Sequence, residues 1–332
     1  MDNAQDWLST AWLVCPVDFG EAAASWYDVP MSVEKVHLGD DVTIGMSAFG
    51  NYQTTSESLN ALFNSAEGEF ELLLVNDCSP DDTMSLFMET RRRYPRTKVL
   101  SFDRNLEYSG SLNAIFSHAT GRWVLFLSND IFVTPAYLRE LFQIARSDPT
   151  FGIVRGCANF VDNERETHNI KPPAPIMSYG QLAVFAEEHA AVFHGQHLED
   201  DYLTGDAFMV SRAVLDKIGT LDPMFYGYFA DHDYGLRAQI AGFKLVLARA
   251  AFAFHKRDAN FDYLPEPLRN QKMMLRWMRI FENWARFKLK YGLPVDQPYT
   301  SLNNLDWGTL GRRPFSPETC YVAPGDYSKY FR

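Results

Sequence analysis

The sequence lacks a hydrophobic run long enough to cross a membrane, and its few cysteines form no recognisable pair. A membrane-spanning helix needs about 18 to 20 apolar residues, and no window of the 332 residues approaches that length. The four cysteines are scattered without CxxC or metal-ligand spacing, which is typical of reduced thiols. The N-terminal stretch MDNAQDWLSTAWLVCPVD has no basic residue and does not resemble a signal peptide. These features predict a cytoplasmic protein without a transmembrane segment.

Basic residues are also scarce. The chain has 31 Lys and Arg against 42 Asp and Glu, which gives a net charge of -11. A nucleic-acid-binding protein normally presents a basic face, so nucleic acid is excluded as the expected partner. A small phosphorylated ligand stays compatible with this charge if a metal cation neutralises it. The hydrophobic content of 46% is sufficient for a large enzyme core.

Several common catalytic motifs are missing. The sequence has no GxGxxG after a strand, no GxxxxGK[ST], no GxSxG and no HExxH. Their absence argues against dinucleotide-binding enzymes of that kind, P-loop enzymes, hydrolases with a nucleophile elbow and zinc peptidases.

The chain does have a regular alternation of apolar strands and amphipathic helices from about residue 41. Thr54 and Glu57 predict a capping box at the first helix, and FELLLV (70–75) predicts a strand buried on both faces. We expect a parallel, doubly wound α/β sheet. The expected strands are 42–46, 70–75, 99–102, 123–127, 207–210 and 244–247. The expected helices are 54–63, 79–94, 109–119, 135–147, 179–193, 211–218, 231–241 and 268–291.

This pattern divides the chain into three parts. Residues 1–40 are predicted to be an N-terminal extension, residues 41–260 the main α/β domain, and residues 261–332 a helix followed by an irregular tail. Ligands of such sheets bind outside the carboxyl ends of the strands. Two polar clusters, Asn76-Asp77 and Ser128-Asn129-Asp130, follow strands and should therefore face one crevice.

Five stretches carry a more specific pattern: residues 42–51, 72–83, 105–130, 204–245 and 252–255. In this order and spacing they resemble the motifs of family 2 inverting glycosyltransferases with the GT-A fold. FADHDYGLR (229–237) is similar to the matching segment of bacterial galactofuranosyl- and rhamnosyltransferases. The resemblance implies a Rossmann-like mixed sheet flanked by helices. It also implies a nucleotide-diphosphate sugar, UDP- or dTDP-linked, as donor.

The resemblance assigns roles to individual positions. Asp77 matches a carboxylate that accepts a hydrogen bond from the nucleotide base or ribose, although an Asn76-Asp77 turn would also explain it. Glu107 stands where the family commonly has glycine. The other positions matched to the donor are Ser47, Phe49, Asn51, Asn105, Gly110, Asn113, Asn129 and Asp206.

Asp130 and His255 match the metal ligands of the family, so Mn²⁺ or Mg²⁺ is the expected cofactor. Both ions prefer oxygen ligands and take several from phosphate and water, and imidazole suits Mn²⁺ better. Without the motif, a histidine after the predicted strand would more often be a core side chain.

Asp231 matches the general base, which takes the proton of the attacking hydroxyl group. It opens a predicted helix, where an aspartate is also explained by capping alone. Asp233 should point elsewhere on that helix, to cap it or to orient a neighbour.

The expected function is therefore metal-dependent, inverting transfer of a hexosyl or deoxyhexosyl group to a hydroxyl of a glycan or lipid-linked sugar, as in cell-surface polysaccharide synthesis. Any membrane contact would come through that acceptor, and the C-terminal helix offers a surface for the acceptor or for a homo-oligomer. A sugar-nucleotide nucleotidyltransferase is a rival, but AFGNYQTT (48–55) lacks the basic loop it needs. A non-catalytic glycan- or nucleotide-binding protein is another, because Ser128 and Ala230 depart from the family pattern.

Overall fold

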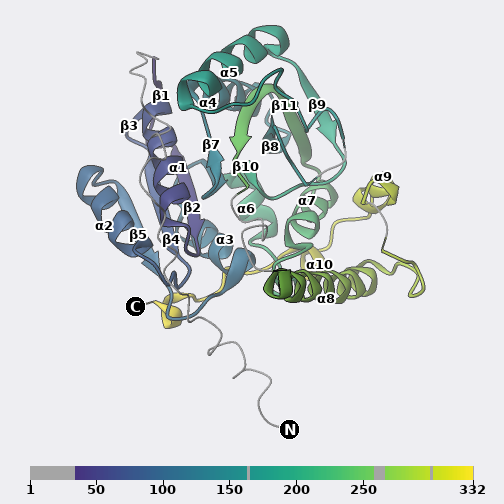
Figure 1. Cartoon of the computed structure of the whole chain (residues 1–332). Coiled ribbons are helices and arrows are strands. Elements are labelled where there is room, and N and C mark those ends of the chain that lie inside the picture. The colour runs from purple at the N-terminus through teal and green to yellow at the C-terminus, as the bar shows by residue number, and fades with distance from the viewer. Residues whose placement is uncertain (1–33, 163–164, 258–265, 300–301, 332) are drawn as a thin grey trace.

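The computed structural model of the chain describes residues 34–162, 165–257, 266–299 and 302–331 (Figure 1). A nine-stranded sheet forms its centre, in the order β5-β4-β2-β6-β10-β8-β11-β7 with β9 paired to β11, and β1 and β3 form a separate pair. The strands are β1 Val36–Leu38, β2 Val42–Ala48, β3 Ala66–Gly68, β4 Glu71–Asn76, β5 Thr97–Ser101, β6 Trp123–Ser128, β7 Ile131–Phe132, β8 Phe151–Ala158, β9 His197–Asp200, β10 Ala207–Ser211 and β11 Lys244–His255.

Helices cover both faces of this sheet. In β4, alternate side chains point to opposite faces: Leu72 and Leu74 pack with α1, α2 and α4, whereas Leu73 and Val75 belong to the core formed with α3, α6 and α7. The apolar run of β4 is therefore buried on both sides, as predicted. The helices are α1 Tyr52–Ser65, α2 Thr83–Arg93, α3 Glu107–His118, α4 Pro135–Ser147, α5 Tyr179–Phe193, α6 Arg212–Ile218, α7 Ala230–Ile240, α8 Glu266–Tyr291, α9 Trp307–Gly311 and α10 Pro317–Cys320, with 3₁₀ turns η3 Leu302–Asn304 and η4 Ser328–Tyr330.

The sheet is mixed, as the resemblance implies, so the expectation of an all-parallel sheet is wrong at β10, β7 and β9, whereas β8 and β11 pair in parallel. Strands β5, β4, β2 and β6 are parallel, but β10 runs antiparallel to both of its neighbours, β6 and β8. Ala207, the first residue of β10, lies opposite Leu127 near the end of β6. This reversed direction brings the residues that precede β10 to the same edge as the carboxyl ends of the parallel strands.

Several predicted boundaries need correction. Helix α1 begins at Tyr52 after Asn51, whose φ of 60° is left-handed, so Thr54 and Glu57 lie inside the helix and form no capping box. Strand β11 is continuous to His255, so FAFH is part of the strand instead of following it. Strand β8 was not predicted because Arg155 and two glycines interrupt its apolar pattern (FGIVRGCA), although all eight of its residues are buried.

The C-terminal part of the chain packs on the α3, α6 and α7 side of the sheet. Trp284 and Phe287 of α8 and Trp307 of α9 are buried in the same core as the strands of that face. Beyond α9 the chain runs back across the molecule until Phe331 pairs with Phe102 beside β5 (Figure 1). The tail predicted to lack regular structure thus contains α9, α10 and two short turns. Within the described ranges, no helix combines the length and apolar character that a membrane span requires.

Candidate active site

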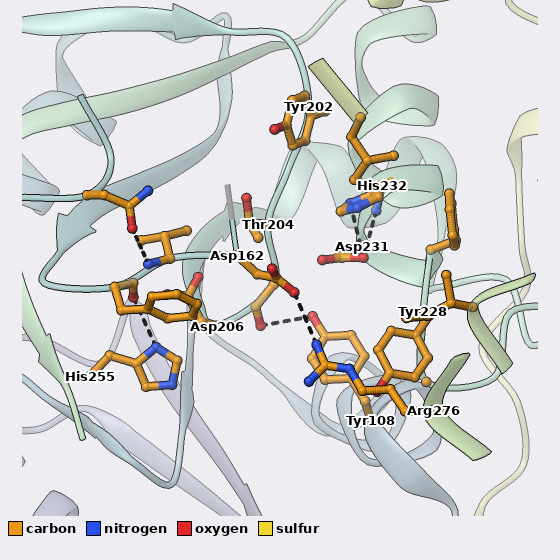
Figure 2. Close-up of a pocket in the computed structure, with 18 of the residues that line it drawn as sticks. Tyr108, Asp162, Tyr202, Thr204, Asp206, Tyr228, Asp231, His232, His255 and Arg276 are labelled. Carbon is orange, nitrogen blue, oxygen red and sulfur yellow. Dashed lines mark hydrogen bonds and ion pairs between the residues drawn. The ribbon is translucent and has the colours of Figure 1, made fainter. Parts of the chain in front are cut away.

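A cleft of about 1250 Å³ opens at the edge of the sheet where β10 begins and β11 ends. Its walls come from the start of α7, the loop after β8, and α8. Three predicted site residues, Asp206, Asp231 and His255, line it, and Figure 2 shows them around the same cavity. The predicted donor sugar, catalytic and metal positions therefore meet in one place, although the chain separates them widely.

Asp130 and His255 are brought together by strand pairing. The two-residue strand β7 pairs antiparallel with the end of β11, so that Ile131 lies opposite His255, and the Lys256 N–H donates to the Asp130 carbonyl at 2.9 Å. As a result, His255 Nε2 lies 3.2 Å from Asp130 Oδ2. Burial disfavours the charged imidazole, but the hydrogen bond and negative charge of Asp130 outweigh burial and raise the pKa of His255.

This pair has the chemistry of a metal site. His255 Nδ1 lies 3.0 Å from the carbonyl of Phe160, to which it donates, so Nε2 is the nitrogen that faces Asp130 and can bind a metal. A carboxylate and an imidazole suit Mn²⁺. No third His, Cys, Asp or Glu joins them to form a metal cluster in the parts of the chain that the structure describes. A metal ion held by this pair would take its remaining ligands from water and phosphate oxygens.

Asp206 is held in place by a buried arginine that the sequence did not reveal. Arg155 of β8 donates from Nη2 to Asp206 Oδ1 and from Nη1 to the Thr204 carbonyl, both at 2.9 Å. Its guanidinium is almost fully buried and balances the charge of the carboxylate. The Thr204 hydroxyl, also buried and lining the cleft, has no hydrogen-bond partner within the described residues. This turn therefore holds a buried, unpaired hydroxyl group next to the cleft.

Asp231 lies in the first turn of α7 and faces the cleft beside Tyr108 and His232 (Figure 2). Its Oδ1 accepts from the His232 backbone N–H at 3.0 Å, and the His232 ring donates from Nδ1 to the Leu203 carbonyl at 2.7 Å. The N-terminal end of α7, where the helix dipole is positive, lies beside this carboxylate. Asp231 therefore has the setting of a base that can accept a proton from the cleft.

Gly205 packs so closely against this group that no side chain fits. An added Cβ would lie 2.0 Å from Tyr108 Oη and 3.0 Å from Asp231 Cβ. We expect Gly205→Ala to lower the free energy of unfolding by about 1–3 kcal/mol in urea titrations, because overpacking strains its neighbours. Tyr108→Phe in the same chain should recover part of the loss, because the hydroxyl makes the shortest contact. Gly308→Ala, where the nearest atom is 3.7 Å from the added carbon, is the control. Equal losses of unfolding free energy in Gly205→Ala and Gly308→Ala would contradict the close packing described for Gly205.

Other predicted donor residues lie at the carboxyl edge of the sheet but outside the lining of the large cleft. Ser47 pairs with Val75 and Ser128 across three neighbouring strands, which confirms that the two polar clusters share one edge. The donor positions Phe49 and Asn51 follow β2 and are exposed, and the Asn129 amide donates to Thr55 Oγ1 at 2.8 Å.

Asp77 is almost completely buried at the end of β4. Burial raises its pKa to about 7, although Leu106 N–H donates to the carboxylate at 2.6 Å and opposes that rise. The carboxyl group of Asp77 therefore changes its charge near neutral pH. Its neighbour Asn76 bonds to Ser101 Oγ and Ser79 N, and so holds the local turn.

The loop before α3 and its first turns face a second, smaller pocket of about 270 Å³. Gly110 and Asn113 line it together with Tyr327 and Tyr330 from the C-terminal tail. The Asn113 side-chain amide donates to the Leu221 carbonyl and accepts from the Leu221 N–H. These contacts favour a role for Asn113 in holding the loop that contains Leu221.

Two neighbouring positions of this loop are held by local contacts. Asn105 accepts from the Glu107 N–H at 2.7 Å. Glu107 has a φ of 55°, the left-handed region that favours glycine, and its carboxylate pairs with Arg279 of α8. The glutamate that stands at position 107, where the family commonly has glycine, thus forms an ion pair that glycine could not form.

Sequence reasoning missed residues that line the cleft, or in the case of Arg155 support it from below, only through tertiary packing. Arg155 lies in an unpredicted strand, and Tyr108 lies between two positions that were assigned to the nucleotide. Trp277 and Arg276 of α8 line the cleft, but the amphipathic pattern of that helix indicates only a packing surface. The sequence signal available for these residues is a polar or aromatic side chain within an otherwise apolar pattern.

Comparisons with known proteins agree with this architecture. ExoO, a succinoglycan biosynthesis protein of Rhizobium meliloti (strain 1021), is 30% identical over 116 residues, 35% of this chain and 32% of that protein. The uncharacterized glycosyltransferase alr2836 of Nostoc sp. (strain PCC 7120 / SAG 25.82 / UTEX 2576) is 20% identical over 190 residues, 57% of this chain and 56% of the relative. The matches thus span from about a third to just over half the length of these two curated relatives.

Among solved structures, GalNAc-T7 with UDP, GalNAc and Mn²⁺ is similar with a TM-score of 0.52 at 11% identity, over 76% of this chain and 48% of that one. This likeness supports the GT-A fold. The model of the family described as glycosyl transferase family 2 matches residues 43–219, which is more than half of the chain and contains β2 to α6. The resemblance inferred from the ordered motifs is confirmed, and the chain belongs to glycosyl transferase family 2.

Proposed function

We propose that this protein transfers a sugar from a nucleoside diphosphate sugar to a hydroxyl group of a glycan or lipid-linked sugar, with inversion at the anomeric carbon. The observation that carries the proposal is the convergence of Asp231, Asp206 and the Asp130–His255 pair on one cleft in a member of this family. The similar GalNAc-T7 structure holds UDP and Mn²⁺, which supports the same classes of donor and metal here. The similarity to a succinoglycan biosynthesis protein supports a polysaccharide as the product.

In the proposed reaction, Asp231 takes the proton of the acceptor hydroxyl while its oxygen bonds to the anomeric carbon. The bond from that carbon to the donor phosphate breaks, and the nucleoside diphosphate leaves. Asp206 would bind a sugar hydroxyl from the turn that Arg155 holds. Asp130 and His255 would hold a divalent cation, which neutralises the diphosphate and assists its departure.

The rivals have less support. A nucleotidyltransferase would need basic groups after β2, and residues 48–55 contain none. A protein with a degenerate site is disfavoured because Asp130 has a histidine partner despite Ser128, and Asp231 faces the cleft despite Ala230.

The metal role can be tested by calorimetry with UDP and dTDP. We expect Asp130→Ala and His255→Ala each to weaken Mn²⁺-dependent nucleotide binding by at least about tenfold, because each removes one of two protein ligands. Affinity measured with EDTA should be the same in wild type and variants. Unchanged affinity with Mn²⁺ would refute the metal role, and a wild type that binds neither nucleotide would refute a UDP- or dTDP-linked donor.

A further inference from the structure

One wall of the cleft is made by α8, outside the part of the chain that the family match covers. Met273, Arg276, Trp277 and Ile280 of this helix line the cavity. The face of α8 that packs on the protein core carries Trp284, Phe287 and Tyr291, which are buried. Trp277 lies two turns earlier on the same face of α8 as Trp284, but it leaves 45% of its surface exposed, so it is not a core side chain.

Aromatic rings connect Trp277 to the candidate base. Tyr299 lies 6.4 Å from Trp277 and 6.1 Å from Phe229, and Phe229 lies 5.5 Å from the ring of His232, measured between ring centroids. His232 directly follows Asp231. All five residues line the cleft, so a row of aromatic rings runs along this wall from Trp277 to the neighbour of the candidate base.

Polar groups stand beside these rings. The Arg276 guanidinium lies 3.6 Å from Asp162 and over the ring of Tyr228, at 5.7 Å from its centroid (Figure 2). No described residue accepts a hydrogen bond from the Trp277 indole N–H. Flat rings beside hydrogen-bonding groups suit a ligand with apolar faces and polar edges. A sugar ring has this character.

This wall is held firmly. Asn283 of α8 donates to the Tyr226 carbonyl at 2.9 Å, and Arg279 pairs with Glu107 at the start of α3. A surface fixed before binding loses less conformational freedom when a ligand arrives. The cleft of about 1250 Å³ also exceeds the roughly 300–1000 Å³ typical of sites for one small molecule.

We propose that α8 binds the acceptor, and that the acceptor is an oligosaccharide of at least two sugar units. The unit that receives the new sugar lies at Asp231, and a preceding unit stacks on Trp277. This inference rests on the proposed transferase function and names the substrate class of the same cleft. It assigns acceptor binding to Trp277 and leaves donor binding to the opposite side of Asp231.

The experiment measures binding of the full chain, with UDP and Mn²⁺ present, to a printed array of bacterial mono- and oligosaccharides. We expect wild type to bind some oligosaccharides, and Trp277→Ala to bind them at least about tenfold more weakly. Trp277→Phe should keep most of the binding, because a ring remains. Met278→Ala is the matched control, because Met278 is a neighbouring, exposed α8 residue that does not line the cleft. All variants should bind UDP equally and unfold at the same urea concentration.

Each result supports or overturns the inference. If wild type binds UDP but no oligosaccharide, or only monosaccharides, the acceptor class is wrong while the donor function stands. If Trp277→Ala binds as well as wild type, or Met278→Ala loses as much, the assignment to Trp277 is wrong. If wild type fails to bind any nucleotide, the proposed transferase function itself fails.

Discussion

Replacing Asp231 by Asn is expected to slow sugar transfer by about 100- to 10,000-fold, the usual contribution of a general base. Asn has nearly the same shape, and its side-chain oxygen can still accept from the His232 backbone N–H, as Asp231 Oδ1 does at 3.0 Å. The substitution removes the negative charge and the ability to take a proton. The expected loss is therefore chemical, and the fold and the cleft should stay intact.

The measurement is the release of nucleoside diphosphate from a panel of UDP-, dTDP- and GDP-sugars with Mn²⁺. Asp162→Asn is the control, because Asp162 lines the same cleft but pairs with Arg276, and 76% of its side chain is exposed. Its rate should change far less than that of Asp231→Asn. Nucleotide affinity should be equal in both variants, because neither residue is proposed to hold the nucleotide. Equal turnover in wild type and Asp231→Asn would show that Asp231 is not the general base.

Local sequence pattern predicts well the elements that have clear capping residues or uniformly apolar faces. Helices α4 and α5 have the predicted bounds because their ends carry clear signals: Thr134 and Ser178 accept hydrogen bonds from the first turn of each helix. Strand β4 was predicted because both of its faces are apolar. These features depend on neighbours in the sequence.

The features that the sequence did not predict depend on contacts between distant segments. Strand β8 is central and buried, but Arg155 breaks its apolar run because its charge is needed beneath Asp206. The antiparallel direction of β10 leaves no periodic signal. Local pattern also contains nothing that places Trp277 in the cleft, since its exposure depends on how the whole of α8 docks.

The candidate site residues are predicted through the resemblance, and the structure adds how some of them meet. Asp130 and His255 are 125 positions apart and meet because two residues of β7 pair with the end of β11. Two-residue strands have no recognisable pattern. Their effect on a site becomes visible only when the partner strand is in place.

Asp233 shows how two similar carboxylates on one helix can have different roles. Two residues after Asp231, it points into the core, where its side chain is completely buried. It accepts from Arg237 Nε and from the Tyr291 hydroxyl, both at 2.7 Å, and Lys290 Nζ lies 2.6 Å away. Arg237 in turn donates to the carbonyls of Ile218, Thr220 and Cys320. The expectation that Asp233 orients a neighbour and faces away from the cleft is confirmed by these contacts.

Asp233→Asn should therefore lower the free energy of unfolding by about 3–5 kcal/mol, the cost of leaving a buried charge without its partner. The whole loss comes from the folded state, because Arg237 has no exposed surface through which water could replace the carboxylate. Urea unfolding followed by circular dichroism measures it. Glu282→Gln is the control: it breaks an exposed pair with Arg286 on the surface of α8, and such pairs contribute about 0–1 kcal/mol. If the two variants unfold at the same urea concentration, Asp233 does not anchor α7 to α8 and the C-terminal segment. If only Asp233→Asn is destabilised, the Asp233 carboxylate anchors α7 to α8, the helix that forms one wall of the cleft.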